Sequence, residues 1–370
     1  METSFSQTCV APINIAVIKY CTEWGKSDEE LIIPLNDSIS ITLDTNYMFT
    51  KTTATIGPQL KEDTIILNNE EGPKESQRFK NCLSEVRKLA ANSSHATAVD
   101  KSKWKVQITS ENNFPTKAGL ASSASGYAFY TLARLFGIDS NSSELSALAR
   151  RGSGSACRSL FGGFVRWHKG PPCVARQVVP ADHWPELRCL VAVVSSGSKD
   201  VGSTEGMQRS VQTSTLLHHR VHQVVPERIQ KMEEAILAKD FEHFARLTMQ
   251  DSNQFHAICL DTYPPLFYLN STSQAIIQVV HRYNSLHNKV KVAYTFDAGP
   301  NAVLFMEETE MASFAALFHS IFGGQPRDDF FRGASIPARS LDSNVGAKFE
   351  DLITDERLNG NVQYVISCTV

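Results

Sequence analysis

Small residues fill one stretch of the chain that the flanking pattern places between a strand and a helix. It reads Pro115-Thr-Lys-Ala-Gly-Leu-Ala-Ser-Ser-Ala-Ser-Gly126. Small side chains let a phosphate approach the main chain, and the free N–H groups of a first helical turn form an anion site with the helix dipole. Serine hydroxyls there could add donors or meet a metal ion. The stretch predicts a phosphate loop; the alternative is an ordinary capped helix with a tightly packed start.

A second stretch combines small residues with cations. It reads Arg150-Arg-Gly-Ser-Gly-Ser-Ala-Cys-Arg158. Its amides and hydroxyls could bind a diphosphate, and Arg158 could donate two hydrogen bonds to one carboxylate. The alternative is a Gly/Ser connection that caps a helix, with its arginines in surface ion pairs.

Polar residues also gather at one strand end and at one turn. Asn14, Lys19, Tyr20 and Lys26 surround the end of a predicted strand, where a lysine is usually solvated. Asp297 opens an Asp-Ala-Gly-Pro-Asn turn between two predicted strands, and an aspartate at that position commonly accepts local amides. Taken singly, each of these residues has a structural explanation.

Two further polar segments have weaker signals. Residues 251–256, Asp-Ser-Asn-Gln-Phe-His, could line a pocket, but we interpret them as a helix with a satisfied internal network. His218, His219 and His222 are the nearest approach to a metal motif. They lack the glutamate of an H-E-x-x-H pattern, so we interpret them as a solvated helix surface.

The elements that must position these residues follow from hydrophobic periodicity. Alternation predicts strands at 13–18, 37–43, 51–56 and 104–110, and helical spacing predicts helices at 77–91, 121–136 (before Gly137) and 144–151. The later part predicts a strand at 187–194, a loop at 195–203, helices near 226–238, 240–257, 272–284 and 308–321, two strands flanking Asp297, and a last strand at 362–368. We expect a surface loop at 91–103. No strict βαβ repeat appears, so we predict an α+β fold with domains 1–185 and 186–370.

Composition limits the class of protein. The 370 residues include 36 Lys+Arg and 39 Asp+Glu, for a net charge of −3, which argues against a nucleic-acid-coating protein. No apolar run approaches the ~18 residues of a membrane span. The first residues, Met-Glu-Thr-Ser-Phe-Ser, lack a basic and an apolar region, so we expect no secretion signal, no membrane insertion and a cytoplasmic location. The cysteines show no C-x-x-C spacing and are expected to be reduced.

Together, these segments resemble a known family. The pattern Pro-x-x-x-Gly-Leu-x-Ser-Ser-Ala at 115–124 resembles the phosphate loop of the GHMP kinase superfamily. Within it, the chain is similar to the mevalonate diphosphate decarboxylase family through the strings APINIAVIKY (11–20), NNFPTKAGLASSASG (112–126), RRGSGSACRSLFGGFVRW (150–167), STEGMQRSV (203–211), DSNQFHAICLDTYPP (251–265) and YTFDAGPNAV (294–303).

The resemblance implies both a fold and a reaction. The fold would have a ribosomal-protein-like N-terminal domain and a ferredoxin-like C-terminal domain, usually in a homodimer. The reaction would be the ATP-dependent decarboxylation of mevalonate 5-diphosphate to isopentenyl diphosphate, with release of ADP, phosphate and carbon dioxide, in the presence of Mg²⁺.

The resemblance also implies roles for individual residues. Asp297 would orient or deprotonate the substrate hydroxyl, and Lys19 would neutralise charge during phosphoryl transfer. Arg158, held by Asn14, would bind the substrate carboxylate. The implied diphosphate ligands are Tyr20, Lys26, Ser153, Gly154, Ser155 and Ser203. The implied ATP-binding residues are Pro115, Gly119, Leu120, Ala121, Ser122, Ser123 and Ala124, with Ser123 the candidate Mg²⁺ ligand.

The chain departs from the family pattern at two positions and also in the slightly short helix after the loop and the slightly long stretch before Arg150. Two rival functions stay open. Cys21-Thr-Glu23 interrupts the expected Tyr-Trp-Gly-Lys, and Lys117 replaces a small apolar residue. One rival is a kinase of the superfamily that stops at phosphorylation, although both Arg158 and Asn14, whose loss would favour it, are present. The other is a catalytically silent ligand-binding relative, which would be favoured if the insertion disrupts the diphosphate site.

Overall fold

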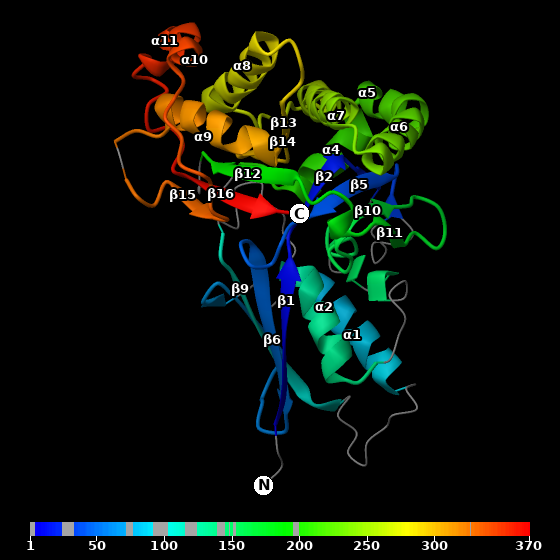
Figure 1. Cartoon of the computed structure of the whole chain (residues 1–370). Coiled ribbons are helices and arrows are strands. Elements are labelled where there is room, and N and C mark those ends of the chain that lie inside the picture. The colour runs from blue at the N-terminus through cyan, green and yellow to red at the C-terminus, as the bar shows by residue number, and fades with distance from the viewer. Residues whose placement is uncertain are drawn as a thin grey trace.

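The computed structural model describes residues 4–23, 33–71, 77–91, 103–114, 124–138, 145–147, 149–150, 153–194, 200–325 and 327–370. Strands and helices are mixed along these ranges, which confirms the predicted α+β class (Figure 1). The described strands form a sheet of five strands, a second of four, a third of five and a two-stranded ribbon.

The first sheet carries its own small core. Its order is β1 (Phe5–Pro12), β6 (Phe49–Gly57), β9 (Lys105–Asn112), β7 (Thr64–Leu67) and β8 (Glu70–Glu71). Helix α2 (Ala124–Leu135) packs on β1, β6 and β9, and α1 (Gln77–Ala91) packs on α2. Gly137 follows α2 at a φ of +66°, the left-handed conformation that a helix C-cap needs.

The second sheet is the most deeply buried part of the N-terminal region. Its order is β11 (Ala175–Val179), β10 (Gly163–Trp167), β5 (Ser38–Thr42) and β2 (Asn14–Ile18). Every residue of β2 and β5 is buried, as expected for strands covered on both faces. After β2 the chain forms β3 (Thr22–Glu23), which pairs with β4 (Ile33–Pro34), so part of the insertion lies in a short ribbon. A 3₁₀ turn (Ala181–His183) then leads into the third sheet.

The third sheet has the order β13 (Val292–Phe296), β14 (Ala302–Glu307), β12 (Leu187–Val193), β16 (Tyr364–Thr369) and β15 (Phe331–Gly333). Helix α8 (Ser271–Leu286) packs on β13, and α9 (Glu308–Phe322) packs on β12 and β14 (Figure 1). The short helices α10 (Ser343–Lys348) and α11 (Glu350–Ile353) follow, and α11 packs on α9. An Asn270–Ser273 capping box begins α8.

A group of helices connects the second and third sheets. It consists of α4 (Ser203–Thr213), α5 (Thr215–His219), a π-helical turn (Arg220–Val224), α6 (Val225–Ala238) and α7 (Phe241–Asp261). Helix α7 contacts β2 of the second sheet and β13 of the third. The main core cluster draws on both sheets. The division at residue 185 stays a prediction.

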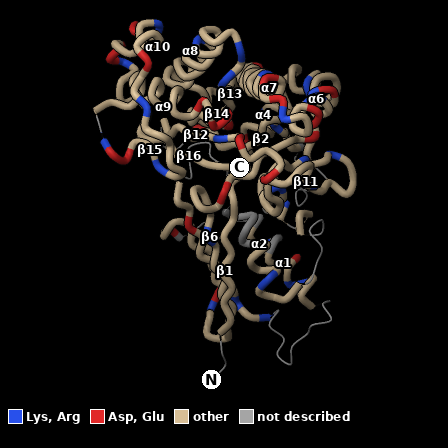
Figure 2. The backbone as a smooth tube through the Cα atoms, viewed as in Figure 1, with Lys and Arg blue, Asp and Glu red and all other residues tan. Residues whose placement is uncertain are grey.

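Charged residues and cysteines are distributed over the described part of the chain as follows. Both charge signs occur on α6 and α7 (Figure 2). The described cysteines are free, and β12 pairs with β16 so that Cys189 lies opposite Cys368. Within the described ranges, no helix is long and apolar enough to cross a membrane. Apart from its two ends, the loop expected at 91–103 lies outside the described residues.

Candidate active site

Lys19 and Asp297 form an ion pair between two sheets. Lys19 follows β2 and Asp297 follows β13, and the Lys19 Nζ lies 2.5 Å from the Asp297 Oδ1. The lysine side chain is only 5% exposed, whereas the aspartate is 30% exposed. The alternative of a solvated lysine at a strand end is therefore wrong. The aspartate keeps one face open to an incoming group.

Neighbouring side chains bind the main chain of Lys19 on both sides. Its N–H donates to the Asp251 Oδ2 at 2.7 Å. Its carbonyl accepts from the Arg220 Nη2 at 2.8 Å and from the Asn36 Nδ2 at 3.0 Å. These hydrogen bonds fix the main chain of Lys19 independently of the contact between its side chain and Asp297.

Arg158 is a buried cation held by neutral groups. It is 2% exposed. Its Nε and Nη2 donate to the Asn14 Oδ1 at 3.2 and 3.0 Å, which confirms the expected contact between the two residues. Its Nε also reaches the Ser40 Oγ at 3.1 Å, and its Nη1 reaches the Ser38 Oγ at 3.4 Å. Among the described residues no Asp or Glu pairs with it, so the alternative of a surface ion pair is wrong.

Two aromatic rings cover the Arg158 guanidinium. Its Cζ lies 4.7 Å from the centre of the Tyr20 ring and 5.5 Å from that of Trp167. Burial raises the pKa of Tyr20, although the Arg158 charge opposes the shift. Tyr20 also senses the Asp297 charge. Tyr20 directly follows Lys19 in the chain, so its contact with Arg158 places the arginine near the Lys19–Asp297 pair.

The Gly/Ser stretch lies against these rings. A Cβ built on Gly154 would meet Trp167 at 3.0 Å and Tyr20 at 3.3 Å, so a side chain there would crowd both rings. The Ser153 and Ser155 hydroxyls share a hydrogen bond of 2.9 Å. The Asn14 Nδ2 donates to the Ser155 carbonyl at 2.9 Å and to the Ser159 hydroxyl.

The remaining predicted site residues are not placed together with this group. Ser203 is exposed at the first turn of α4, and no hydrogen bond or ion pair among the described residues joins it to Lys19 or Arg158. Lys26, Lys117 and the loop residues Pro115, Gly119, Leu120, Ala121, Ser122 and Ser123 lie outside the described residues. Ala124 is the first described residue of α2.

Helix α7 carries polar residues that sequence reasoning assigned differently. We expected residues 251–256 to satisfy one another within the helix, and this expectation is wrong. Asp251 binds Lys19 and two arginines, and the Ser252 Oγ accepts from the Phe296 N–H at 3.0 Å. These bonds reach across to both sheets. Each bond joins residues that are far apart in the sequence. The amphipathic pattern of the helix does not indicate which residues these side chains bind.

His256 lies beside the ion pair as a neutral ring. Burial, and next the Lys19 charge, lower its pKa to about 4, while Phe296 and Asp297 oppose the shift. Its Nε2 is buried and has no hydrogen-bond partner among the described residues. The site therefore contains one unprotonated imidazole at neutral pH.

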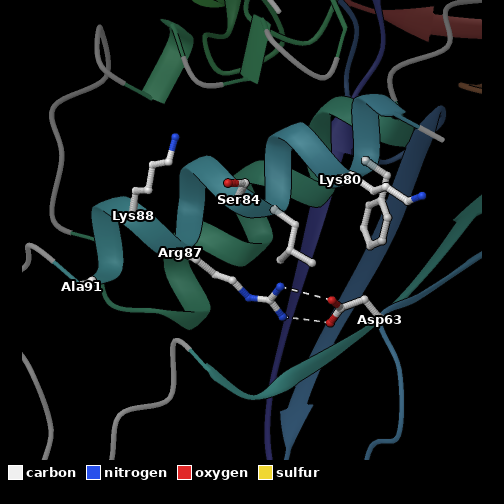
Figure 3. Close-up of a pocket in the computed structure, with 8 residues that line it drawn as sticks. Asp63, Lys80, Ser84, Arg87, Lys88 and Ala91 are labelled. Carbon is white, nitrogen blue, oxygen red and sulfur yellow. Dashed lines mark hydrogen bonds and ion pairs between the residues drawn. The ribbon is translucent and has the colours of Figure 1, made fainter. Parts of the chain in front are cut away.

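Two other clusters share no residue with this group. A pocket of about 530 Å³ lies along α1, where Arg87 donates to both oxygens of Asp63 at 3.1 and 2.9 Å (Figure 3). Its lining contains none of the predicted site residues. His218 and His222 are exposed with their ring centres 4.5 Å apart, on one helix face as predicted. No group of three or more potential metal ligands occurs in the described part of the chain.

Comparisons with known proteins match this chain along nearly its whole length. Residues 11–175 match the Diphosphomevalonate decarboxylase-like N-terminal domain, and residues 189–370 match the Mevalonate 5-diphosphate decarboxylase C-terminal domain. Diphosphomevalonate decarboxylase of Rattus norvegicus is 50% identical over 98% of this chain and 91% of its own length.

Solved structures agree with these matches. Mevalonate diphosphate decarboxylase from Trypanosoma brucei has a TM-score of 0.87 at 37% identity, over 99% of this chain and 96% of its own. The complex of MDDEF with MVAPP, AMPPCP and magnesium has a TM-score of 0.73 at 34% identity, over 86% of this chain and 93% of its own. The fold of this chain is thus the one expected for the GHMP kinase superfamily. The chain belongs to the mevalonate diphosphate decarboxylase family.

Proposed function

We propose that the chain catalyses the ATP-dependent decarboxylation of mevalonate 5-diphosphate to isopentenyl diphosphate, with release of ADP, phosphate and carbon dioxide. One observation carries the proposal beyond a kinase. Arg158 is buried without an acidic partner among the described residues, beside the Lys19–Asp297 pair. A buried charge is normally paired. The substrate carboxylate would supply the missing partner.

Lys19 and Asp297 catalyse the phosphoryl transfer. The Asp297 carboxylate accepts a hydrogen bond from the tertiary hydroxyl of the substrate and takes its proton as the oxygen bonds to the γ-phosphorus of ATP. The bond between that phosphorus and the β,γ-bridging oxygen breaks at the same time, and ADP leaves with its electron pair. The Lys19 ammonium lies 2.5 Å from that carboxylate and neutralises charge on the transferring phosphoryl group. Phosphorylation converts a poor leaving group into a good one.

Elimination then needs no further cofactor. The phosphate leaves the tertiary carbon with its bonding electron pair. The bond between the carboxylate carbon and its neighbour breaks, its electrons form the new double bond, and carbon dioxide departs. Arg158 keeps the carboxylate aligned for this step, because Asn14 and the two aromatic rings fix the guanidinium.

The other phosphate contacts are proposals that rest on the family resemblance. Tyr20, Lys26, Ser153, Gly154, Ser155 and Ser203 would hold the substrate diphosphate. Pro115, Gly119, Leu120, Ala121, Ser122, Ser123 and Ala124 would hold the ATP phosphates. Ser123 would bind Mg²⁺, whose chemistry is to neutralise phosphate charge. The hydroxyl pair of Ser153 and Ser155 and the close approach at Gly154 support a small-residue phosphate site.

Assembly and location are carried over on the same basis. We infer a homodimer and a cytoplasmic location, each implied by the resemblance or by the sequence. Light scattering after size exclusion tests the dimer, and the location of a tagged full chain in cells tests the second point. The near-neutral charge supports a small-molecule substrate over a nucleic acid.

Product analysis tests the reaction. The purified chain is incubated with ATP, Mg²⁺ and mevalonate 5-diphosphate labelled at the carboxylate carbon, and ADP and labelled carbon dioxide are counted together. A reaction without mevalonate 5-diphosphate measures background ATP hydrolysis. The proposal predicts equal amounts of the two products. ADP without carbon dioxide would identify a kinase, and neither product would identify a binding protein.

A further inference from the structure

Two consecutive side chains of α7 bind the two strand ends that carry the ion pair. Asp251 accepts a hydrogen bond from the Lys19 N–H at 2.7 Å, and Ser252 accepts one from the Phe296 N–H at 3.0 Å. Phe296 immediately precedes Asp297. One turn of one helix therefore holds the main chain at Lys19 and next to Asp297.

The Asp251 end of this arrangement is rigid because it is a buried charge network. Asp251 is 0% exposed and accepts from the Arg220 Nη1 at 2.8 Å and from the Arg228 Nη1 at 2.9 Å. Burial alone would raise the pKa of Asp251, but the Arg220 and Arg228 guanidiniums and the Lys19 N–H hold it below its usual range. Arg220 begins the π-helical turn and also donates to the Lys19 carbonyl at 2.8 Å. Departures from α-helical geometry of this kind are frequent at functional sites.

Ser252 binds a main-chain N–H group that has no hydrogen-bond partner within the sheet. β13 is an edge strand of the third sheet, and its described partner is β14 alone. Edge strands leave alternate N–H groups without a ladder partner. Ser252 is 1% exposed, and its hydroxyl accepts a hydrogen bond from the N–H of Phe296. The last residue before Asp297 is thereby tied to α7.

We propose that Asp251 and Ser252 are positioning residues that set the distance and angle between the Lys19 and Asp297 side chains. This inference rests on the proposed function of that pair. Lys19 and Asp297 are 278 positions apart and come from different sheets, so their separation depends on what connects the sheets. Helix α7 contacts both strands directly.

Ser252→Ala is the informative variant. Asp251→Asn removes a buried charge from two arginines and could fail to fold, whereas Ser252→Ala removes one hydroxyl from the protein interior. Thr248→Val is the matched control, because it removes a hydroxyl from the same helix. Thr248 is 0% exposed, and its hydroxyl donates only to the Phe244 carbonyl at 2.8 Å among the described residues.

The experiment measures ADP release, carbon dioxide release, KM for both substrates, thermal midpoint, and hydrogen exchange of a peptide that spans residues 292–300. A misplacement of about 1 Å costs roughly a hundredfold in rate, so losing one of several constraints should lower kcat about tenfold. We expect that fall in Ser252→Ala with both KM values unchanged and with faster exchange of the Phe296 amide. Thr248→Val should keep wild-type kcat and wild-type exchange in that peptide.

The outcomes separate this inference from the proposed function. Unchanged kcat in Ser252→Ala, unchanged exchange at Phe296, or an equal loss of kcat in Thr248→Val would each overturn the positioning role. If the wild type forms ADP without carbon dioxide, decarboxylation is refuted. The tenfold fall in ADP formation still supports the positioning role in that case, and its absence still overturns it.

Discussion

Replacing Arg158 with lysine tests how the substrate carboxylate is bound. A guanidinium has five N–H donors. The bonds to Asn14, Ser40 and Ser38 occupy the Nε–H and one hydrogen on each terminal nitrogen. The Tyr20 hydroxyl also accepts a hydrogen bond from Arg158. A substrate carboxylate that displaces this contact would meet one hydrogen on Nη1 and one on Nη2, which is the arrangement that a bidentate carboxylate requires.

The structure sets the size of the expected effect. Lysine keeps the charge of Arg158 but loses the planar fork and the stacking on Tyr20 and Trp167. A hydrogen bond to a charged group contributes about 1.5–3 kcal/mol, and the lysine ammonium can replace one of the two. A net loss of about 2 kcal/mol corresponds to a fall of roughly 30-fold in kcat/KM for mevalonate 5-diphosphate.

The assay follows ADP release at saturating ATP while mevalonate 5-diphosphate is varied. Arg166→Lys is the matched control, because Arg166 lies on the nearby strand β10 but binds Asp37 and Glu233 instead. We expect the control to keep kcat/KM within about twofold, since ion pairs of this exposure mainly affect stability. A loss of less than threefold in Arg158→Lys, or an equal loss in both variants, would refute the reasoning.

Three further predictions concern stability and crowding. The pKa of His256 is lowered to about 4 in the folded chain, whereas an unfolded histidine has a pKa of about 6.5. The unfolded state therefore binds the proton first as the pH falls below about 6.5. The free energy of unfolding should decrease by about 3 kcal/mol by pH 4. Urea unfolding of His256→Asn should show a smaller loss over that range, whereas His219→Asn, at an exposed position whose side chain has no hydrogen bond or ion pair among the described residues, should match the wild type. Asp251→Ala leaves the buried Arg220 and the partly buried Arg228 without their carboxylate, so chemical denaturation should show a loss of about 3–5 kcal/mol, and a loss below 1 kcal/mol would contradict the network. Gly154→Ala pushes a methyl group against the rings over the guanidinium and should raise KM for mevalonate 5-diphosphate. Gly162→Ala, which meets nothing within 4 Å, should leave KM unchanged.

The sequence predicts the elements with strong periodicity well. The helix expected at 77–91 is α1, and the strand expected at 187–194 is β12. β1 was not predicted because most of its residues are at least partly exposed, so it shows little apolar alternation. β10 was not predicted because both of its faces are buried and only Arg166 interrupts the apolar run.

The site could be predicted where short motifs carry it and not where tertiary contacts do. The contact between Asn14 and Arg158, and the placing of Lys19 and Asp297 at one site, follow from the family resemblance, and the structure brings these residues together. The contacts of Asp251 could not be predicted. Its partners come from other elements, and the sequence of the helix alone does not show which of them lie beside it. The phosphate-loop residues and Lys26 stay predictions.

Asp297→Ala tests the central claim most directly. The variant removes the carboxylate that receives the substrate's proton and changes neither Lys19 nor Arg158. ATP and mevalonate 5-diphosphate binding is measured by calorimetry, and carbon dioxide release is measured under the conditions used for the wild type. The account predicts that both ligands still bind while carbon dioxide release becomes undetectable. Retained carbon dioxide release in Asp297→Ala would contradict it.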